Sequence, residues 1–359
     1  MRIAQVSPLW ERVPPQGYGG IELMVGYLSD ELVRRGHEVT LFASGDSKSL
    51  ATLESVVSQP LRVNPEVVKS PVDPRAYEEL QNKRVQDLAQ EFDLIHIHSL
   101  LPPFHLAEAI STPAVYTMHW RFTPATRLLY EAYSAHNFIS ISLAQRQDGP
   151  NLNYVGNVYN GIDSEGYPLQ TKAQEPPYLA FVGRMAPTKG PHLAIEVAKK
   201  VGLPLKMAGK VDKPIHEFFV QEIEPQIDGN QIQYLGEVGN DEKQALLGGA
   251  LATLFPITWE EPFGLVMIES MAAGTPVIAL RRGSVPEVVA DHKTGFVCES
   301  VDDMVAAVHQ LDKIERSLCR DWVIDNFSIS SMVDGYEVAY QKVLLNQNSL
   351  TQKKLQLDC

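Results

Sequence analysis

Two glutamates, Glu261 and Glu269, flank the start of an apolar helix that the sequence predicts over residues 265–273. Leu, Met and Ala dominate this stretch and favour a helix. Gly264 marks a turn before it, and Gly274 suits a left-handed cap after it. A helix that is apolar on nearly every side is expected to be buried. Because a buried carboxylate is costly without hydrogen bonds, Glu269 needs a polar partner.

The amino end of this helix is a candidate anion site. The amides of Leu265 and Val266 have no partner within the helix, and the helix dipole adds positive charge there. Glu269 lies about one turn further along, and Glu261 lies just outside the same end. The carboxylates could hold hydroxyl groups, so phosphate together with hydroxyls indicates a sugar nucleotide. The alternative is a core helix with one glutamate that reaches solvent.

Two cations follow the predicted strand 178–182. The segment after this strand begins with Gly183 and Arg184 and ends with Lys189 and Gly190. It is therefore expected at the carboxyl edge of a sheet, where open α/β folds bind ligands. Arg184 can fork onto a diphosphate and Lys189 can add a point charge, while the glycines allow close approach of the backbone. The alternative is a loop with two solvated cations.

Three histidines lie on or after predicted strands of the first half. His119 directly follows the strand 114–118 and is expected at the edge of the sheet, although a partly buried imidazole with a structural role is the alternative. His96 and His98 share one face of the strand 94–98, where packing is the expected role. The three histidines lack the paired spacing of zinc ligands, and no D-x-D pair is present. We therefore predict no metal site.

The glycines at the start of the chain are not a dinucleotide fingerprint. Gly17, Gly19 and Gly20 do not match G-x-G-x-x-G, and the loop before the helix is long. A dehydrogenase is therefore disfavoured. No cofactor is predicted, and the nucleotide sugar would be a co-substrate.

The elements that position these residues form two series of alternating strands and helices. The first series begins with a strand at residues 2–6, a helix at 21–35 and a strand at 39–43. Residues 59–75 are proline-rich and are expected to be irregular, and residues 164–177 suit a linker. The remaining expected strands are 138–141, 154–159, 205–208, 231–235, 251–255, 277–280 and 295–298, and the later expected helices are 191–201, 214–225, 240–249, 301–326 and 330–346. This order predicts an α/β protein with two doubly wound, Rossmann-like domains facing across a cleft, at 1–165 and 166–329.

Composition narrows the class of protein. At 359 residues the chain exceeds one hydrophobic core, and its 44% hydrophobic and 21% charged residues are ordinary for a globular protein. The net charge of −13 is shared about evenly between the halves, so a nucleic-acid partner is not expected. Cys298, Cys319 and Cys359 lack metal or disulfide spacing. With no signal segment and no apolar run of roughly 18 residues, the chain is expected to be cytoplasmic, and peripheral contact with the inner membrane face is left open.

Taken together, these motifs resemble the family 4 retaining glycosyltransferases, which have the GT-B fold. The resemblance runs in order from residue 1 to about residue 345. It is carried by Gly19-Gly20-Ile21-Glu22, Asn160-Gly161-Ile162-Asp163, Gly183-Arg184, Lys189-Gly190, Glu261 to Glu269, and Gly283-Ser284-Val285-Pro286-Glu287.

The resemblance implies a role for each site residue. Arg184 and Lys189 would bind the donor diphosphate and stabilise it as it leaves, Glu269 would hold the ribose, and Glu261 would hold hydroxyls of the donor sugar. The other implied donor contacts are Gly19, Gly20 and Gly183 at the diphosphate, His119 beside the sugar at the reacting carbon, Val238 near the base, and the backbone from Phe263 through Gly264 and Leu265 to Val266. The helix 330–346 would cross back onto the first domain.

The implied activity is transfer of a hexose, with retained configuration and no metal, from a nucleotide sugar to a saccharide or lipid-linked acceptor in polysaccharide synthesis. UDP-glucose is the expected donor, ahead of GDP-mannose and UDP-N-acetylglucosamine. A front-face route, in which a donor phosphate oxygen takes the acceptor proton, is favoured over Glu261 as a nucleophile. A sugar-nucleotide epimerase and a non-catalytic protein that binds nucleotide sugars are the alternatives.

Overall fold

The alternating strands form two parallel sheets, each in its own unit. The structure is a computed structural model that describes residues 1–17, 19–69, 73–99 and 101–357. One unit comprises residues 1–161 together with the chain from Ile329 on, and the other comprises residues 162–328. The predicted α/β class with two doubly wound sheets is confirmed.

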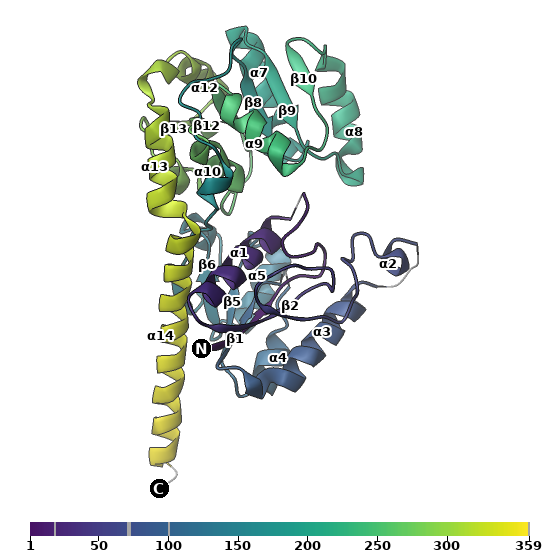
Figure 1. Ribbon diagram of the computed structural model, residues 1–359, viewed down its shortest axis with the longest axis vertical. Helices are drawn as coiled ribbons and strands as arrows, with labels where there is room; N and C mark the ends of the chain where they lie inside the picture. Colours follow the sequence, from purple (N-terminus) through teal and green to yellow (C-terminus); the bar gives the residue numbers. More distant parts are fainter. Residues whose placement is uncertain (18, 70–72, 100, 358–359) are drawn as a thin grey trace. The chain divides into compact units, whose positions relative to one another are not determined.

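The sheet of the first unit has the order β3-β2-β1-β4-β5-β6-β7. Figure 1 labels β1, β2, β5 and β6 of this sheet. Its direction of growth reverses between β1 and β4, so the loops after these strands diverge at the carboxyl edge, where doubly wound sheets bind ligands. The strands are β1 Arg2–Val6, β2 Glu38–Phe42, β3 Thr52–Glu54, β4 Leu94–Ile97, β5 Ala114–Thr117, β6 Asn137–Ser140 and β7 Tyr154–Asn157.

The alternation of side chains along β4 separates an apolar core from a polar one. Ile95 and Ile97 join the hydrophobic cluster beneath α3, α4 and α5. His96 lies on the opposite face and contacts Tyr340 of α14. His98 follows on that same face, and both histidines are buried. The helices of this unit are α1 Gly20–Arg34, α2 Pro65–Lys69, α3 Arg75–Leu88, α4 Phe104–Ala109, α5 Pro124–Ala132, α6 Ala144–Gln147 and α14 Ile329–Leu357.

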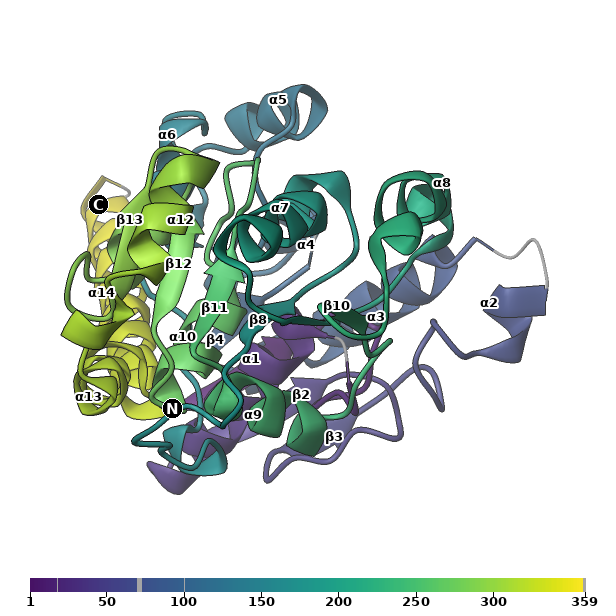
Figure 2. The same ribbon diagram turned by 90° about the horizontal axis from the view of Figure 1, so that it is seen from above.

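The sheet of the second unit has the order β10-β9-β8-β11-β12-β13 and reverses its growth between β8 and β11. Helices α7 and α12 pack together, and α10 packs between α9 and α13 (Figure 2). The strands are β8 Leu179–Val182, β9 Leu205–Ala208, β10 Ile232–Tyr234, β11 Ala252–Phe255, β12 Val277–Leu280 and β13 Gly295–Cys298. The helices are α7 Pro191–Val201, α8 His216–Phe218, α9 Asn240–Gly249, α10 Leu265–Ala272, α11 Val285–Val288, α12 Val301–Val308 and α13 Arg316–Phe327.

Helix α14 returns the chain to the first unit, where it packs against α1 and β7 (Figure 1). Arg35, which follows α1, donates from Nη1 to Asp334 Oδ1 and to Glu337 Oε2, both at 2.6 Å. His37 Nε2 lies 2.8 Å from Glu337 Oε1. Like every other helix among the described residues, α14 lacks the length of apolar sequence that a bilayer span requires.

Three expected segments differ in the structure. The single helix expected over residues 301–326 is two helices, α12 and α13, because Leu311 and Ile314 turn into the core between them. The helix expected over 214–225 is a series of short 3₁₀, α and π turns, and Pro225 supplies no amide for a regular helix. The stretch 59–75 contains the short helix α2, and Pro71 of that stretch lies outside the described residues.

The cysteines that the structure describes are isolated from each other. Cys298 and Cys319 are free and buried. Burial raises the pKa of each thiol to about 12. Cys359 lies outside the described residues.

Glu22 is a buried acid in the first turn of α1. Its Oε1 accepts a hydrogen bond from the backbone amide of Glu11 at 3.3 Å, which ties the loop after β1 to the helix. Burial raises the pKa of Glu22 from 4.5 to about 7. The folded protein therefore holds a proton on this side chain at pH values where the unfolded chain has released it.

This raised pKa predicts a pH-dependent stability change in the Glu22→Gln variant. Between the unfolded pKa and the folded pKa the native state binds more protons, so stability falls as pH rises, by about 3 kcal/mol in total. We expect Glu22→Gln to melt at a higher temperature than wild type at pH 8 and to lose that advantage at pH 4.5. Differential scanning calorimetry at the two pH values measures the difference.

The exposed Glu91 provides the control, because Glu91→Gln should shift the melting temperature equally at both pH values. An advantage of Glu22→Gln that is the same at pH 4.5 and pH 8 would contradict the assignment.

Candidate active site

An ion pair joins the loops after β8 and β11 at the point where the second sheet reverses its growth. Lys189, at the end of a 3₁₀ turn over Pro187–Lys189, donates from Nζ to Glu261 Oε2. Trp259 Nε1 donates to the same oxygen at 2.9 Å, and Lys189 Nζ lies 5.0 Å from the centroid of the Trp259 ring. The side chains of Lys189 and Glu261 are 18% and 11% exposed. Two predicted site residues, 72 positions apart, thus meet directly.

Arg184 lies in the same loop but pairs with a different strand end. Its Nη1 is 3.9 Å from Asp212 Oδ2, at the outer limit of an ion pair. Lys210 Nζ lies 3.0 Å from the other oxygen of Asp212. Asp212 follows β9, the neighbour of β8, and so belongs to the same edge of the sheet. The guanidinium of Arg184 is held loosely and can turn toward an anion.

Helix α10 begins without a capping side chain. Its N-cap, Gly264, has φ 79°, and none of the side chains that the structure describes accepts a hydrogen bond from the first turn. A Cβ on Gly264 would lie 2.8 Å from Met267 Cε and 2.9 Å from Phe255 Cζ, so only glycine fits there. Phe263, just before the helix, is buried, and its carbonyl accepts from Ser284 Oγ at 2.7 Å. The amides of Leu265 and Val266 therefore lie at a helix start whose partial positive charge is not balanced by a capping side chain of the described residues.

Glu269 has the polar partner that its burial requires. Lys243 Nζ of α9 donates to Glu269 Oε1 at 2.7 Å, and the Glu269 side chain is only 6% exposed. Its second oxygen, Oε2, has no protein partner within the described residues. Helix α10 is buried from Met267 to Ala272, so the expected burial of this helix is confirmed.

Gly183 and Gly190 begin and end the loop after β8 that contains Arg184 and Lys189, and they differ in how much room a side chain would have. Gly190 has φ 74°, and a Cβ there would lie 2.0 Å from the carbonyl oxygen of Pro256, so the loop after β8 reaches the end of β11 only with glycine. A Cβ on Gly183 would make an ordinary van der Waals contact with Phe181 Cζ at 3.6 Å, so a larger residue fits there. Val238, between β10 and α9, is half-buried against the small core cluster that contains Tyr178.

His119 belongs to the first unit and is half-buried at the end of β5. Its Nε2 lies 2.9 Å from His98 Nδ1. Burial lowers the pKa of His119 from 6.5 to about 3, so the ring is neutral at physiological pH. A neutral imidazole can donate or accept a hydrogen bond but brings no positive charge.

Gly19 and Gly20 form the start of α1, also in the first unit. Gly19 is the N-cap with φ 152°, and a Cβ there would lie 2.8 Å from Pro15 Cβ. Gly20 is exposed as the first residue of the helix, and no described side chain caps this helix start. This start of α1 lies after β1, at the reversal point of the first sheet.

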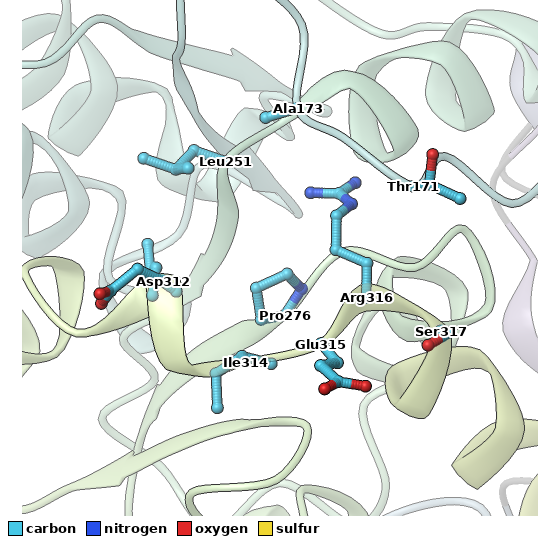
Figure 3. A pocket seen from close by; sticks show the side chains of 10 residues that line it. Thr171, Ala173, Leu251, Pro276, Asp312, Ile314, Glu315, Arg316 and Ser317 are labelled. Atoms are coloured by element: carbon cyan, nitrogen blue, oxygen red, sulfur yellow. The ribbon is translucent and has the colours of Figure 1, made fainter.

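A separate cavity of about 360 Å³ lies at the opposite edge of the second sheet (Figure 3). Its lining includes Leu251 and Pro276, which immediately precede β11 and β12. Arg316 reaches into it, but its guanidinium already donates to the carbonyls of Gln170, Ala250 and Gly248 and to Thr275 Oγ1. This cavity therefore offers no uncommitted cation for a phosphate.

The structure adds three site residues that the motifs did not indicate: Lys243, Asp212 and Trp259. Asp212 follows the end of a strand, so the rule that selected Arg184 also applies to it. Lys243 lies within a polar helix. The sequence indicates that the buried Glu269 needs a polar partner, but it does not indicate that this partner is Lys243. Of the predicted residues, His119, Gly19 and Gly20 belong to the first unit, and the others belong to the second.

Two family models match the chain. The model described as Glycosyltransferase Family 4 matches residues 18–165, and the model described as Glycosyl transferases group 1 matches residues 168–323. Glycogen synthase of Mycobacterium tuberculosis is 27% identical over 365 residues, which cover 87% of this chain and 86% of the relative. Phosphatidyl-myo-inositol mannosyltransferase of Propionibacterium freudenreichii is 26% identical over 322 residues, with 81% and 80% covered.

A solved structure shares the fold of the chain. The crystal structure of Anabaena HepE in complex with UDP and glucose superposes with a TM-score of 0.70 at 18% identity, and the match covers 93% of this chain and 97% of that one. The two family models together extend from residue 18 to residue 323, and the boundary between them falls in the sequence between β7 and β8. The chain therefore belongs to the family 4, or group 1, glycosyltransferases and has the GT-B fold.

Proposed function

We propose that the protein is a retaining hexosyltransferase that moves a sugar from a nucleotide sugar to a saccharide or lipid-linked acceptor during glycan synthesis. The observation that carries the proposal is the convergence of Lys189, Glu261 and Trp259 at the reversal point of the second sheet, next to the uncapped start of α10. UDP-glucose is the proposed donor, because HepE was solved with UDP and glucose and glycogen synthase is a relative.

The proposed site stabilises the charge of the departing diphosphate. Lys189 and Arg184 supply two positive charges, and the amides at the start of α10 add a third electropositive group. Glu261 neutralises Lys189 in the free protein, and on donor binding the phosphate oxygens share that cation. We propose that this set suffices without a metal ion. The start of α1 at Gly19 and Gly20 is proposed to bind phosphate as well.

The remaining residues are proposed to hold the nucleoside and the sugar. Within the described residues, Glu269 Oε2 accepts no hydrogen bond while Oε1 is bound by Lys243, and such a free acceptor suits a ribose hydroxyl. Glu261 Oε1 has no protein partner in the described part of the chain and can accept from a hydroxyl of the donor sugar. Val238 lies in the loop proposed to contact the base, and the neutral His119 is proposed to contact a sugar hydroxyl.

The proposed chemistry proceeds on one face of the donor sugar. The acceptor oxygen forms a bond to the anomeric carbon as the bond to the diphosphate oxygen breaks and its electron pair leaves with the nucleotide. A donor phosphate oxygen takes the acceptor proton. Glu261 is a poor nucleophile, because Lys189 and the indole of Trp259 both bind its Oε2 and stabilise the negative charge.

Release of UDP from UDP-glucose tests the activity. We expect UDP to accumulate faster when a saccharide or lipid-linked acceptor is added, and to do so equally in EDTA. A new sugar nucleotide without UDP would identify an epimerase, and binding without turnover would identify a non-catalytic protein. Parallel reactions with GDP-mannose and UDP-N-acetylglucosamine decide the donor.

The Lys189→Ala variant tests the charge that stabilises the diphosphate. We expect turnover to fall by about 10²-fold or more, since one stabilising charge on the leaving group is lost. Steady-state UDP release measures the loss, and the melting temperature reports whether the variant folds. Lys199→Ala, on the exposed surface of α7, is the matched control and should keep wild-type turnover. Unchanged turnover in a folded Lys189→Ala variant would remove Lys189 from the mechanism.

The Glu269→Ala variant tests the ribose contact. We expect the affinity for UDP to weaken by roughly 1–3 kcal/mol, the range for a lost hydrogen bond to a charged group. Isothermal titration calorimetry with UDP measures this affinity without requiring turnover. Glu196→Ala on α7 is the control, and its UDP affinity should equal that of wild type. Equal UDP affinity in Glu269→Ala would assign Glu269 to structure alone.

A further inference from the structure

Seven polar side chains of the first unit form one continuous hydrogen-bonded series, which we call the polar chain. In order they are His119, His98, Gln5, Tyr340, His96, Thr117 and Tyr336. The successive distances between their polar atoms are 2.9, 2.9, 3.0, 2.7, 2.7 and 3.3 Å. All members except the half-buried His119 are buried. The polar chain thus links the C-terminal helix α14 to His119.

The direction of donation is the same along the whole polar chain. Gln5 Nε2 donates to the Tyr340 hydroxyl, so Gln5 Oε1 must accept the proton on His98 Nε2. A neutral imidazole carries one N–H, so His98 Nδ1 is an acceptor. The proton between the two rings therefore belongs to His119 Nε2. It follows that His119 Nδ1 carries a lone pair.

The far end of the polar chain agrees with this direction. Thr117 Oγ1 donates to the Tyr336 hydroxyl, so Thr117 must accept from His96 Nε2. His96 Nδ1 is then the acceptor for the Tyr340 hydroxyl proton. Each of the six hydrogen bonds then joins one donor to one acceptor, and no ring needs a second proton.

No charged group enters the polar chain. Burial lowers the pKa of His96 and of His98 well below 6.5, and the rings further lower one another. The groups that face the three histidines are the Gln5 amide, the Thr117 hydroxyl and the Tyr336 and Tyr340 phenols. Glu337 acts on Tyr340 from the same helix, but its carboxylate is bound by Arg35 and His37. The rings therefore stay neutral, and the single N–H of each has a defined place.

We propose that Gln5, oriented by Tyr340 of α14, is a positioning residue that fixes His119 as the Nε2–H tautomer and presents Nδ1 as an acceptor for a hydroxyl of the bound sugar. His119 Nδ1 has no protein partner in the described part of the chain. The sugar hydroxyl rests on the proposed function, whereas the tautomer does not. A fixed acceptor favours a ligand that donates at this point and disfavours one that can only accept.

The test reads the tautomer directly from the ring nitrogens. In full-length protein with ¹⁵N-labelled histidine, long-range ¹H–¹⁵N spectra at pH 7 should show His119 as Nε2–H, with the signal assigned by its loss in His119→Gln. In Gln5→Met, a protonated His98 Nε2 would be a buried orphan donor, so the His98 proton should move to Nδ1. His119 should then become Nδ1–H. An Nδ1–H ring in wild type, or no change in Gln5→Met, would overturn the proposal.

Two phenol variants on α14 test the role of that helix. Tyr340→Phe removes the group that orients Gln5, so the Nε2–H population of His119 should fall. Tyr336→Phe removes only the last member of the polar chain and is the matched control, with wild-type spectra expected at His119. An unchanged tautomer in Tyr340→Phe would show that α14 plays no part.

Kinetics separate this inference from the proposed function. Gln5→Met should lower kcat/KM for the nucleotide sugar by about tenfold, the loss of one hydrogen bond, while the affinity for UDP stays at the wild-type value. A tautomer change without any glycosyl transfer by wild type would refute the proposed function and leave the inference standing. Transfer with an unchanged kcat/KM in a variant whose tautomer has changed would refute the sugar contact.

Discussion

The ion pair between Lys189 and Glu261 is the contact on which the arrangement of the candidate site depends. Each side chain is largely removed from water, and a buried charge is strongly destabilising without its partner. The pair can form because the second sheet grows outward from β8 and later returns to place β11 beside it. Gly190 then lets the loop after β8 approach the backbone of Pro256. Topology and one glycine thus bring together two loops that are remote in sequence.

Most strands of the two sheets could be predicted from the sequence. Short apolar runs located β9, β12 and β13 at their observed bounds, because buried parallel strands are nearly continuous in apolar residues. The short β3 has no such run, since Thr52 and Glu54 are polar. The break between α12 and α13 depends on which face Leu311 and Ile314 bury, and this is a tertiary contact that periodicity along one helix does not contain.

Residues of the candidate site could be predicted from the sequence where they follow strands. Residues that pair with a side chain of another element could not be predicted in this way. Arg184, Lys189 and His119 were identifiable because the carboxyl ends of parallel strands gather at one edge. Lys243 was not, because its partner Glu269 is on another helix and only the folded arrangement pairs them. The two units also use polarity differently. The second gathers charged side chains at the carboxyl edge of its sheet, whereas the first buries a neutral polar chain that ends at His119.

Helix α14 has a consequence for how the protein is made. Its residues Tyr336 and Tyr340 complete the polar chain, whose other members lie on β1, β4 and β5 or directly after β4 and β5 and leave the ribosome much earlier. Until α14 emerges, Gln5 Nε2 and His96 Nδ1 lack the Tyr340 hydroxyl as a partner, and the layer between the sheet and the missing helix must stay hydrated or loosely packed. The second unit has no such dependence, because residues 162–328 are continuous. The unit translated first is therefore expected to complete its native packing last.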